Sequence, residues 1–281
     1  MTSQNWTAVI TSKKPLFDVN FRELWKYRDL VILSVRRDLI AMHKQTIMGP
    51  LWYFVQPLIS TVVYQVIFGS VLKIATDRIP PFLFFMSGIV IWYYFSACLS
   101  KTATIFTSNQ NLFTKVYFPR LAIPIAQIIS NAWQFIIQLV IFLGFYLFFL
   151  WKGAPIHFSY RVIIIPFLIL QTALLGLGFG CWIAAVTTRF RDLQMAVPPF
   201  IQLWMYASCV FYPLSSAPPH LQNILIFNPL VPIIESFRFA MMGQGQIQIW
   251  QWLVSLGVTL LVLMIGLIEF GRAEKTMADT I

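Results

Sequence analysis

The chain has 281 residues, of which 58% are hydrophobic and only 11% are charged, and its formal net charge is +10. Soluble domains carry about 25% charged residues, so this composition excludes an ordinary soluble domain and fits a single membrane domain. The positive charge does not indicate a nucleic-acid-binding protein, because the cations are concentrated in alternate segments between apolar stretches.

The N-terminal segment, residues 1–47, is predicted to be cytoplasmic and to contain an amphipathic helix over residues 21–44. On a helical wheel, apolar side chains gather on one broad side, while the cations Arg36, Arg37 and Lys44 lie on the other. Four residues are exceptions to this pattern, namely Arg28, Leu33, Asp38 and Ile40. Such a helix is either an anchor in the headgroup region, held by anionic lipid, or a lever that contacts both the membrane and a cytoplasmic partner. The first 20 residues lack the apolar core of an export signal.

Six long apolar stretches follow, and none of them contains Asp, Glu, Lys or Arg. They cover residues 48–72, 82–100, 123–150, 162–186, 197–214 and 250–268. Each is about long enough to cross a hydrocarbon layer of ~30 Å as a helix. The sequence therefore predicts an all-α integral membrane fold of six transmembrane helices, with the membrane domain at residues 48–270 and a cytoplasmic tail at residues 271–281.

The cations predict which side of the membrane each loop occupies. Fifteen of the 20 Lys and Arg residues lie in the N-terminal segment, in the second and fourth connections between spans, and in the tail. The other five lie in the intervening connections. By the positive-inside rule both termini are expected to be cytoplasmic.

The first internal loop, residues 101–120, mixes amides, cations and aromatic residues. Its candidate contact residues are Asn109, Asn111, Phe113, Lys115 and Arg120. A loop of this kind is either simply solvated or a docking surface for a cytoplasmic partner.

The last external segment, residues 215–249, is almost as apolar as a span but contains Pro229 and Pro232. Closely spaced prolines disfavour a continuous crossing helix, so we expect short re-entrant or interfacial helices here. Glu235 and Arg238 lie one helical turn apart in this segment and are expected to pair.

Uncharged polar and aromatic residues recur at helical spacing in three of the spans. They are Tyr53, Gln56, Ser60 and Tyr64 in the first, Gln127, Asn131, Gln134 and Gln138 in the third, and Gln202, Tyr206, Cys209 and Tyr212 in the fifth. Each stripe alone is equally well explained by interhelical hydrogen bonds or by an aromatic belt at the headgroups. Three stripes together favour a path for a sugar chain, because aromatic faces stack on sugar rings while amides exchange hydrogen bonds with hydroxyl groups.

Several kinds of chemistry are missing from the sequence. The spans hold no carboxylate of the kind that proton- or sodium-coupled carriers use, so the energy for transport is expected to come from elsewhere. No G-x-x-x-x-G-K-[ST] sequence occurs, and His43, His157 and His220 pair with no nucleophile or carboxylate at a recognisable spacing. We therefore expect no catalytic residue and no metal site, and we interpret the three cysteines as small packing residues.

Five runs of sequence resemble the membrane subunits of ABC-2 type polysaccharide and polyol-phosphate exporters. They are HKQTIMGPLWYFVQPL from His43, FPRLAIPIA from Phe118, GLGFGCWIAAVTTRFRDL from Gly176, CVFYP from Cys209 and NPLVPIIESFR from Asn228. The resemblance covers most of the chain, in order. It implies a homodimer that binds two copies of a separate ATPase subunit, with ATP and Mg bound there and no cofactor on this chain.

The resemblance also implies roles for the residues singled out above. Arg36, Arg37 and Lys44, with the loop from Asn109 to Arg120, would receive the motion of the ATPase. The aromatic and amide stripes would line a glycan path at the dimer centre. The expected function is export of a lipid-linked, O-antigen-like polysaccharide across the cytoplasmic membrane. A drug or small-lipid exporter of the same transporter class is one alternative. A membrane glycosyltransferase is another, but that chemistry needs carboxylates or a metal near the membrane face, and Asp77 and Glu235, the only carboxylates predicted to be external, make a poor pair for it.

Overall fold

The computed structural model describes residues 25–44, 49, 51–108, 118–157, 159–190, 192–245 and 248–279. All regular secondary structure in this part of the chain is helical. The elements are α2 (Arg28–Lys44), α3 (Leu51–Tyr64), the π-helix η1 (Gln65–Val71), α4 (Pro81–Ala103), α5 (Ile105–Ser108), α7 (Ala122–Trp151), η2 (Tyr160–Ile164), α8 (Ile165–Arg189), α9 (Leu193–Tyr206), η3 (Leu214–Ser216), α10 (Pro219–Leu225), α11 (Leu230–Met242) and α12 (Ile249–Asp279).

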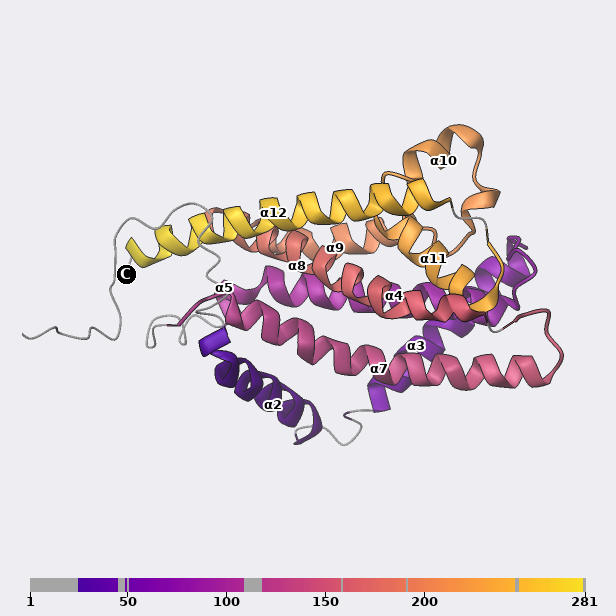
Figure 1. The fold of residues 1–281 in the computed structure, drawn as a ribbon, viewed down its shortest axis with the longest axis horizontal. Coiled ribbons are helices and arrows are strands. Elements are labelled where there is room, and N and C mark those ends of the chain that lie inside the picture. The colour runs from indigo at the N-terminus through magenta and orange to yellow at the C-terminus, as the bar shows by residue number, and fades with distance from the viewer. Residues whose placement is uncertain are drawn as a thin grey trace, which may run out of the picture.

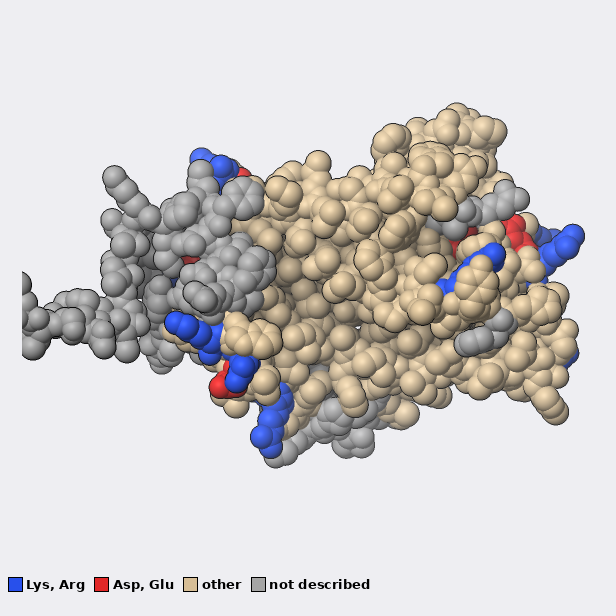
Figure 2. Space-filling model, viewed as in Figure 1, with Lys and Arg blue, Asp and Glu red and all other residues tan. Residues whose placement is uncertain are grey.

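Five helical stretches are long and apolar enough to cross a membrane. They are α3 with η1 (Leu51–Val71), α4, α7, η2 with α8 (Tyr160–Arg189), and α12 up to Glu274. Figure 1 shows the long helices running roughly along one axis of the molecule. On the face drawn in Figure 2, a broad band without charged side chains separates two ends where Lys and Arg gather. The structure thus confirms an all-α, multi-pass membrane protein.

The predicted fifth span, residues 197–214, differs from the observed structure. Helix α9 ends at Tyr206, and its 14 residues rise only ~21 Å, less than the ~30 Å of a hydrocarbon layer. The chain then turns without regular structure up to η3, and Cys209 adopts a φ of 53°. An α-helix cannot continue through that left-handed conformation. The second half of this predicted span is therefore an irregular segment.

The segment predicted to be external, residues 215–249, contains two short helices, as predicted. Helices α10 and α11 meet at an angle of 99°, and together they count as one broken span or re-entrant loop. Pro229 lies at the junction, and Gly243 ends α11 with a left-handed φ of 69°. In Figure 1, α10 projects from one end of the bundle, whereas α11 packs against α4, α8 and α12.

Helix α8 lies between α4 and α12, and glycines allow the close approach on both sides. Gly176 and Gly180 face α4. A Cβ atom on Gly176 would come within 2.7 Å of the Cys98 Cβ, and one on Gly180 within 2.4 Å of the Thr102 Cβ. Gly178 faces α12, where a Cβ on Gly266 would lie 2.1 Å from the Gly178 carbonyl oxygen. Small residues at such crossings are typical of membrane helices that pack by their backbones.

Candidate substrate path and coupling surface

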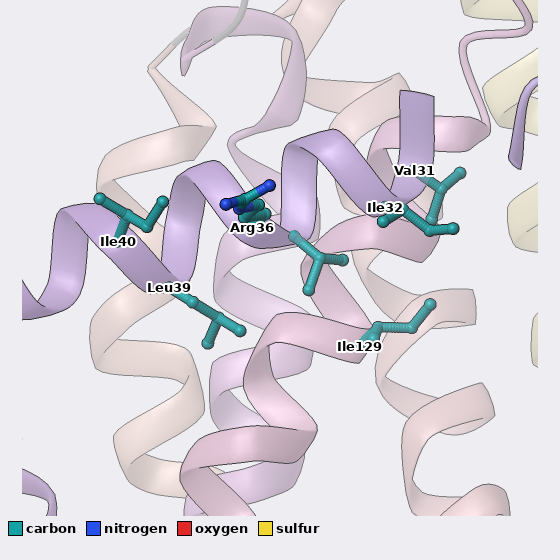
Figure 3. Close-up of a pocket in the computed structure, with 7 residues that line it drawn as sticks. Val31, Ile32, Arg36, Leu39, Ile40 and Ile129 are labelled. Carbon is teal, nitrogen blue, oxygen red and sulfur yellow. The ribbon is translucent and has the colours of Figure 1, made fainter. Parts of the chain in front are cut away.

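The amphipathic helix α2 packs against the N-terminal half of α7, at the same end of the molecule as α5 and the end of α12 (Figure 1). Tyr27, Leu30 and Val31 contact an apolar cluster that includes Phe106, Phe118 and Phe270. The two arginines predicted to couple to the ATPase lie in different surroundings. The guanidinium of Arg37 pairs with Asp38 at 3.0 Å, whereas Arg36 lines an apolar groove between α2 and α7 (Figure 3).

Only some of the other predicted coupling residues belong to the described part of the chain. Outside it lie Asn109, Asn111, Phe113 and Lys115, whereas Lys44 is described as the last residue of α2. Arg120 is described, and its Nη1 donates a hydrogen bond of 2.7 Å to the carbonyl oxygen of Glu274 near the end of α12. The described coupling residues therefore lie at the end of the molecule that the cation distribution assigns to the cytoplasm.

The amides of α7 point toward α2 and α4. Gln127 donates a hydrogen bond of 2.9 Å to Oδ2 of Asp38, which explains why Asp38 lies on the apolar arc of the helical wheel. Asn131 accepts a hydrogen bond of 2.6 Å from Nζ of Lys101. Gln134 is half-buried, and Gln138 is buried, with no hydrogen-bond partner for its Oε1 within the described residues. In a single copy of the chain, Gln127 thus links α7 to α2, and Asn131 links α7 to α4.

The stripes of α3 and α9 meet around Phe211, which the sequence pattern missed. The Tyr64 and Phe211 ring centroids lie 4.7 Å apart with the rings edge to face, Phe68 stacks on Phe211 at 4.6 Å, and Tyr206 lies 5.2 Å from Phe211. We call these four residues the Phe211 cluster. Phe68 could have been found, because it follows Tyr64 by one helical turn. Phe211 could not, because it lies in the irregular segment and follows no helical spacing.

The other predicted path residues of α3 and α9 differ in exposure. Gln56 and Gln202 are exposed, and Tyr53 is half-buried. The hydroxyl groups of Ser60 and Tyr93 are hydrogen-bonded at 2.6 Å, so Ser60 also ties α3 to α4. Tyr212 donates a hydrogen bond of 3.1 Å to the carbonyl oxygen of Tyr206. The structure thus links α3 and α9 through the Phe211 cluster, and α7 also packs against α3.

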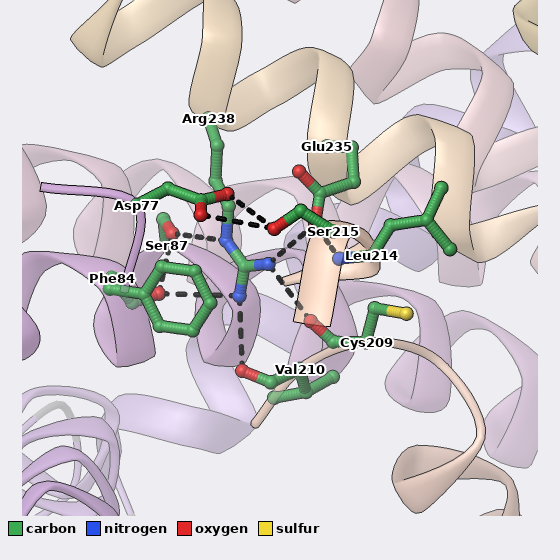
Figure 4. Close-up of polar contacts among 9 residues, drawn as sticks. All are labelled: Asp77, Phe84, Ser87, Cys209, Val210, Leu214, Ser215, Glu235 and Arg238. Carbon is green, nitrogen blue, oxygen red and sulfur yellow. Dashed lines mark hydrogen bonds and ion pairs between the residues drawn. The ribbon is translucent and has the colours of Figure 1, made fainter. Parts of the chain in front are cut away.

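A buried arginine fixes the segment that carries Phe211 (Figure 4). The side chain of Arg238 in α11 is 1% exposed, and its Nη1 donates to the carbonyl oxygen of Cys209 at 2.9 Å and to Oε1 of Glu235 at 3.1 Å. Its Nη2 donates to the carbonyl oxygen of Val210 at 3.0 Å, and its Nε to the hydroxyl group of Ser87 in α4 at 3.3 Å. The expected ion pair with Glu235 is therefore present, as part of a larger set of bonds.

These bonds explain how the strained turn persists. A positive φ at a non-glycine residue costs about 1–3 kcal/mol and survives only where the surroundings hold it. The guanidinium also lies 3.7 Å from the centre of the Phe84 ring. Gly88 leaves room for it, because a Cβ there would come within 2.9 Å of the arginine Nη2. We call Glu235, Arg238 and the groups that they bond the Arg238 node.

The external carboxylates are both engaged in the structure. Asp77 accepts a hydrogen bond of 3.0 Å from the hydroxyl group of Ser215, and Glu235 accepts one from the backbone N–H of Leu214 besides its ion pair. In the described part of the chain, no group of three His, Cys, Asp or Glu residues could hold a metal ion. The arrangement of the described residues offers aromatic faces and uncharged polar groups.

Comparison with known proteins places this architecture in a family. The family model described as ABC-2 type transporter matches residues 29–242. A Myxococcus xanthus protein named O-antigen export system permease protein RfbA is 31% identical over 220 residues, which cover 77% of this chain and 82% of the relative. A Klebsiella pneumoniae protein of the same name is 24% identical over 253 residues, 89% of this chain and 94% of the relative.

A third relative acts on a different polymer. The Escherichia coli polysialic acid transport protein KpsM is 27% identical over 238 residues, which cover 82% of this chain and 88% of the relative. The family match extends over all the helices from α3 to α11. This chain belongs to the ABC-2 type transporter membrane family.

Proposed function

We propose that this chain is the membrane-spanning permease subunit of an ATP-driven exporter that moves a lipid-linked, O-antigen-like polysaccharide across the bacterial cytoplasmic membrane. The observation that carries the proposal is the Phe211 cluster, in which the buried Phe211 ring connects half-buried Tyr64 of α3 with exposed Tyr206 of α9. Gln56 and Gln202 are exposed on the same two helices, which therefore offer a surface with aromatic rings and amides. The names of the relatives, which export O-antigen or transport polysialic acid, support the same substrate class.

The surface suits a sliding polymer. Aromatic rings attract the apolar faces of sugars without fixing one register, and amide side chains offer both donors and acceptors to hydroxyl groups. Gln56, Gln202 and Tyr206 are exposed in the single copy. We expect a second copy of the chain to cover them, so the proposed path lies at the centre of a homodimer.

The energy would come from a separate ATPase subunit, which binds ATP and Mg, while this chain carries no cofactor. The hydrogen bond between Asp38 and Gln127 gives a direct route from the cytoplasmic helix α2 to α7. Arg120 gives a second route, because it links the start of α7 to the end of α12. Purified alone, the chain is expected to hydrolyse no ATP.

The orientation can be tested with single cysteines. Thr107 is expected on the cytoplasmic side and Ser216 outside, and both are exposed. The three natural cysteines are buried, so they give little background labelling. An impermeant thiol reagent added to whole cells should label Ser216→Cys and spare Thr107→Cys. Labelling of Thr107→Cys from outside would contradict cytoplasmic termini.

The substrate class is tested by replacing the exposed polar residues of the path. The double variant Gln56→Leu/Gln202→Leu should lower surface polysaccharide per permease molecule, because the hydroxyl groups of a glycan lose their partners. Ile59→Ala and Leu203→Ala, exposed apolar positions on the same helices, serve as controls that should export normally. Normal glycan export by the double variant, with loss of resistance to a hydrophobic drug instead, would favour the drug-exporter alternative.

A further inference from the structure

The groove between α2 and α7 has an almost wholly apolar wall, to which the exposed Arg36 contributes the carbon atoms of its side chain. Its lining is Val31, Ile32, Val35, Arg36, Leu39, Ile40 and Ile129, and its volume is about 430 Å³. This volume lies within the range of ~300–1,000 Å³ that is usual for ligand pockets. Ile32, Arg36 and Ile40 follow one another at intervals of one turn, so the arginine stands midway along the apolar wall (Figure 3).

Arg36 differs from the other arginines of α2 by its lack of a counter-ion. Arg28 lies 3.8 Å from Asp29 and Arg37 lies 3.0 Å from Asp38, so each carboxylate of α2 is next to its own arginine. Within the described residues, Arg36 has no carboxylate within ion-pair distance. An exposed cation beside an apolar groove, with no counter-ion among the described residues, is complementary to an anion that carries an apolar chain.

We infer that this groove binds one anionic phospholipid of the leaflet that faces α2, with an acyl chain along Val35, Leu39 and Ile129 and the phosphate at Arg36. The position fits such an occupant. Ile32, Ile40 and Ile129 are 61%, 41% and 47% exposed, so apolar surface is open where α2 meets the bilayer-spanning helix α7. A cation near a membrane surface contributes about 1 kcal/mol to the binding of anionic lipid, and burial of the acyl chain adds to the affinity.

A bound lipid would have a mechanical consequence for α2. This helix reaches α7 through the Asp38–Gln127 hydrogen bond on one side and through its apolar contacts on another. A lipid in the groove would fill the remaining open side and hold α2 at a fixed distance from α7. The inference concerns the lipid around the transporter, and it stands or falls independently of which substrate is exported.

The test is native mass spectrometry of the purified full-length chain, titrated separately with phosphatidylglycerol and phosphatidylcholine. The wild type should bind the first phosphatidylglycerol about five-fold more tightly, the ratio that ~1 kcal/mol gives. Arg36→Gln should abolish the preference. Arg37→Gln is the matched control, because it removes the same charge at the neighbouring residue, whose side chain does not line the groove. This variant should keep the preference.

A second pair of variants tests the acyl chain. Ile129→Trp should fill the groove and weaken the binding of both lipids, whereas Leu33→Trp, exposed on α2 but outside the groove, should leave both unchanged. Equal effects of Arg36→Gln and Arg37→Gln would overturn the inference in favour of diffuse attraction. Unchanged lipid binding by Ile129→Trp would also overturn it, because an acyl chain bound in the groove must compete with the indole ring. Displacement of the lipid by inorganic phosphate alone would overturn it too, because phosphate cannot replace the acyl chain.

Discussion

The layer of α4, α8 and α12 and the side formed by α3 and α9 use their surfaces in opposite ways. In the most apolar stretch of α4, 78% of the residues are buried within the chain. In that of α3 with η1, only 11% are buried. Glycines bring α8 into backbone contact with both neighbours, while α3 and α9 meet through aromatic rings and leave apolar side chains open. The first region is a scaffold in which α4 is covered by its own chain, whereas the apolar stretch of α12 at its edge is 22% buried. The second is a surface that lipid, substrate or another copy must cover.

The largest effect is expected at the Arg238 node, where the two regions meet. Arg238→Met leaves Glu235 buried without its partner, and it should lower the free energy of unfolding by about 3–5 kcal/mol. Thermal denaturation of the purified chain measures the loss. Arg78→Met, an exposed change at the same end of the molecule, is the control and should have little effect. The double variant Glu235→Gln/Arg238→Met should recover part of the loss, and a fully stable Arg238→Met protein would show that the node does not hold the fold.

The second effect is expected inside the scaffold. Gly266→Leu drives a side chain into the backbone of α8, and overpacking of this kind costs about 1–3 kcal/mol or more. Gly257→Leu is the matched control on the same helix, because a Cβ there meets nothing within 4 Å. Folded protein recovered after solubilisation should drop for the first variant only. Equal recovery would mean that the α8–α12 contact adjusts easily.

The third effect is expected at Tyr206, on the side formed by α3 and α9. Unlike the two changes above, its loss should lower export more than it lowers stability. Tyr206 is 48% exposed, and its ring pair with Phe211 contributes about 0.5–1.5 kcal/mol beyond buried area. Tyr206→Ala should therefore fold and insert but export less polysaccharide per molecule, while Tyr206→Phe keeps the ring and should export normally. If expression and export fell together in Tyr206→Ala, the ring would be a packing residue of the scaffold.

The smallest effect is expected at the link between α2 and α7. Gln127→Leu removes one hydrogen bond to Asp38, and a typical bond of this kind contributes about 1 kcal/mol. We expect near-normal stability but fewer molecules exported per ATP hydrolysed by the complete transporter. Ile136→Ala, at an exposed position of α7 outside the predicted path, is the control. A normal ratio in Gln127→Leu would exclude this hydrogen bond as a route of coupling.

The sequence predicted the long helices well, because a stretch of about twenty apolar residues without charge is long enough to span a bilayer and too apolar to face water. It predicted the short external helices from Pro229 and Pro232 for a similarly local reason. It did not predict where α9 ends, because a left-handed Cys209 is stabilised by Arg238, which lies 29 residues away.

The candidate site was predictable only where it follows helical spacing. Tyr64 and Tyr206 were found, and Phe68 was within reach of the same argument. Phe211 was not, because tertiary contacts place it. Asp38 shows that a misfit can be informative, since a carboxylate on an apolar arc indicated a polar partner, which the structure identifies as Gln127.

Helix α12 has a length that its role as a span does not require. Its 31 residues extend ~46 Å, whereas the hydrocarbon layer is ~30 Å thick. Roughly the last three turns therefore stand outside the bilayer, at the end where Arg120 bonds to the carbonyl oxygen of Glu274. Through Gly266 and Gly178 this projecting stem is continuous with the rigid interior, so a push on the stem would tilt α8 and α12 as one piece.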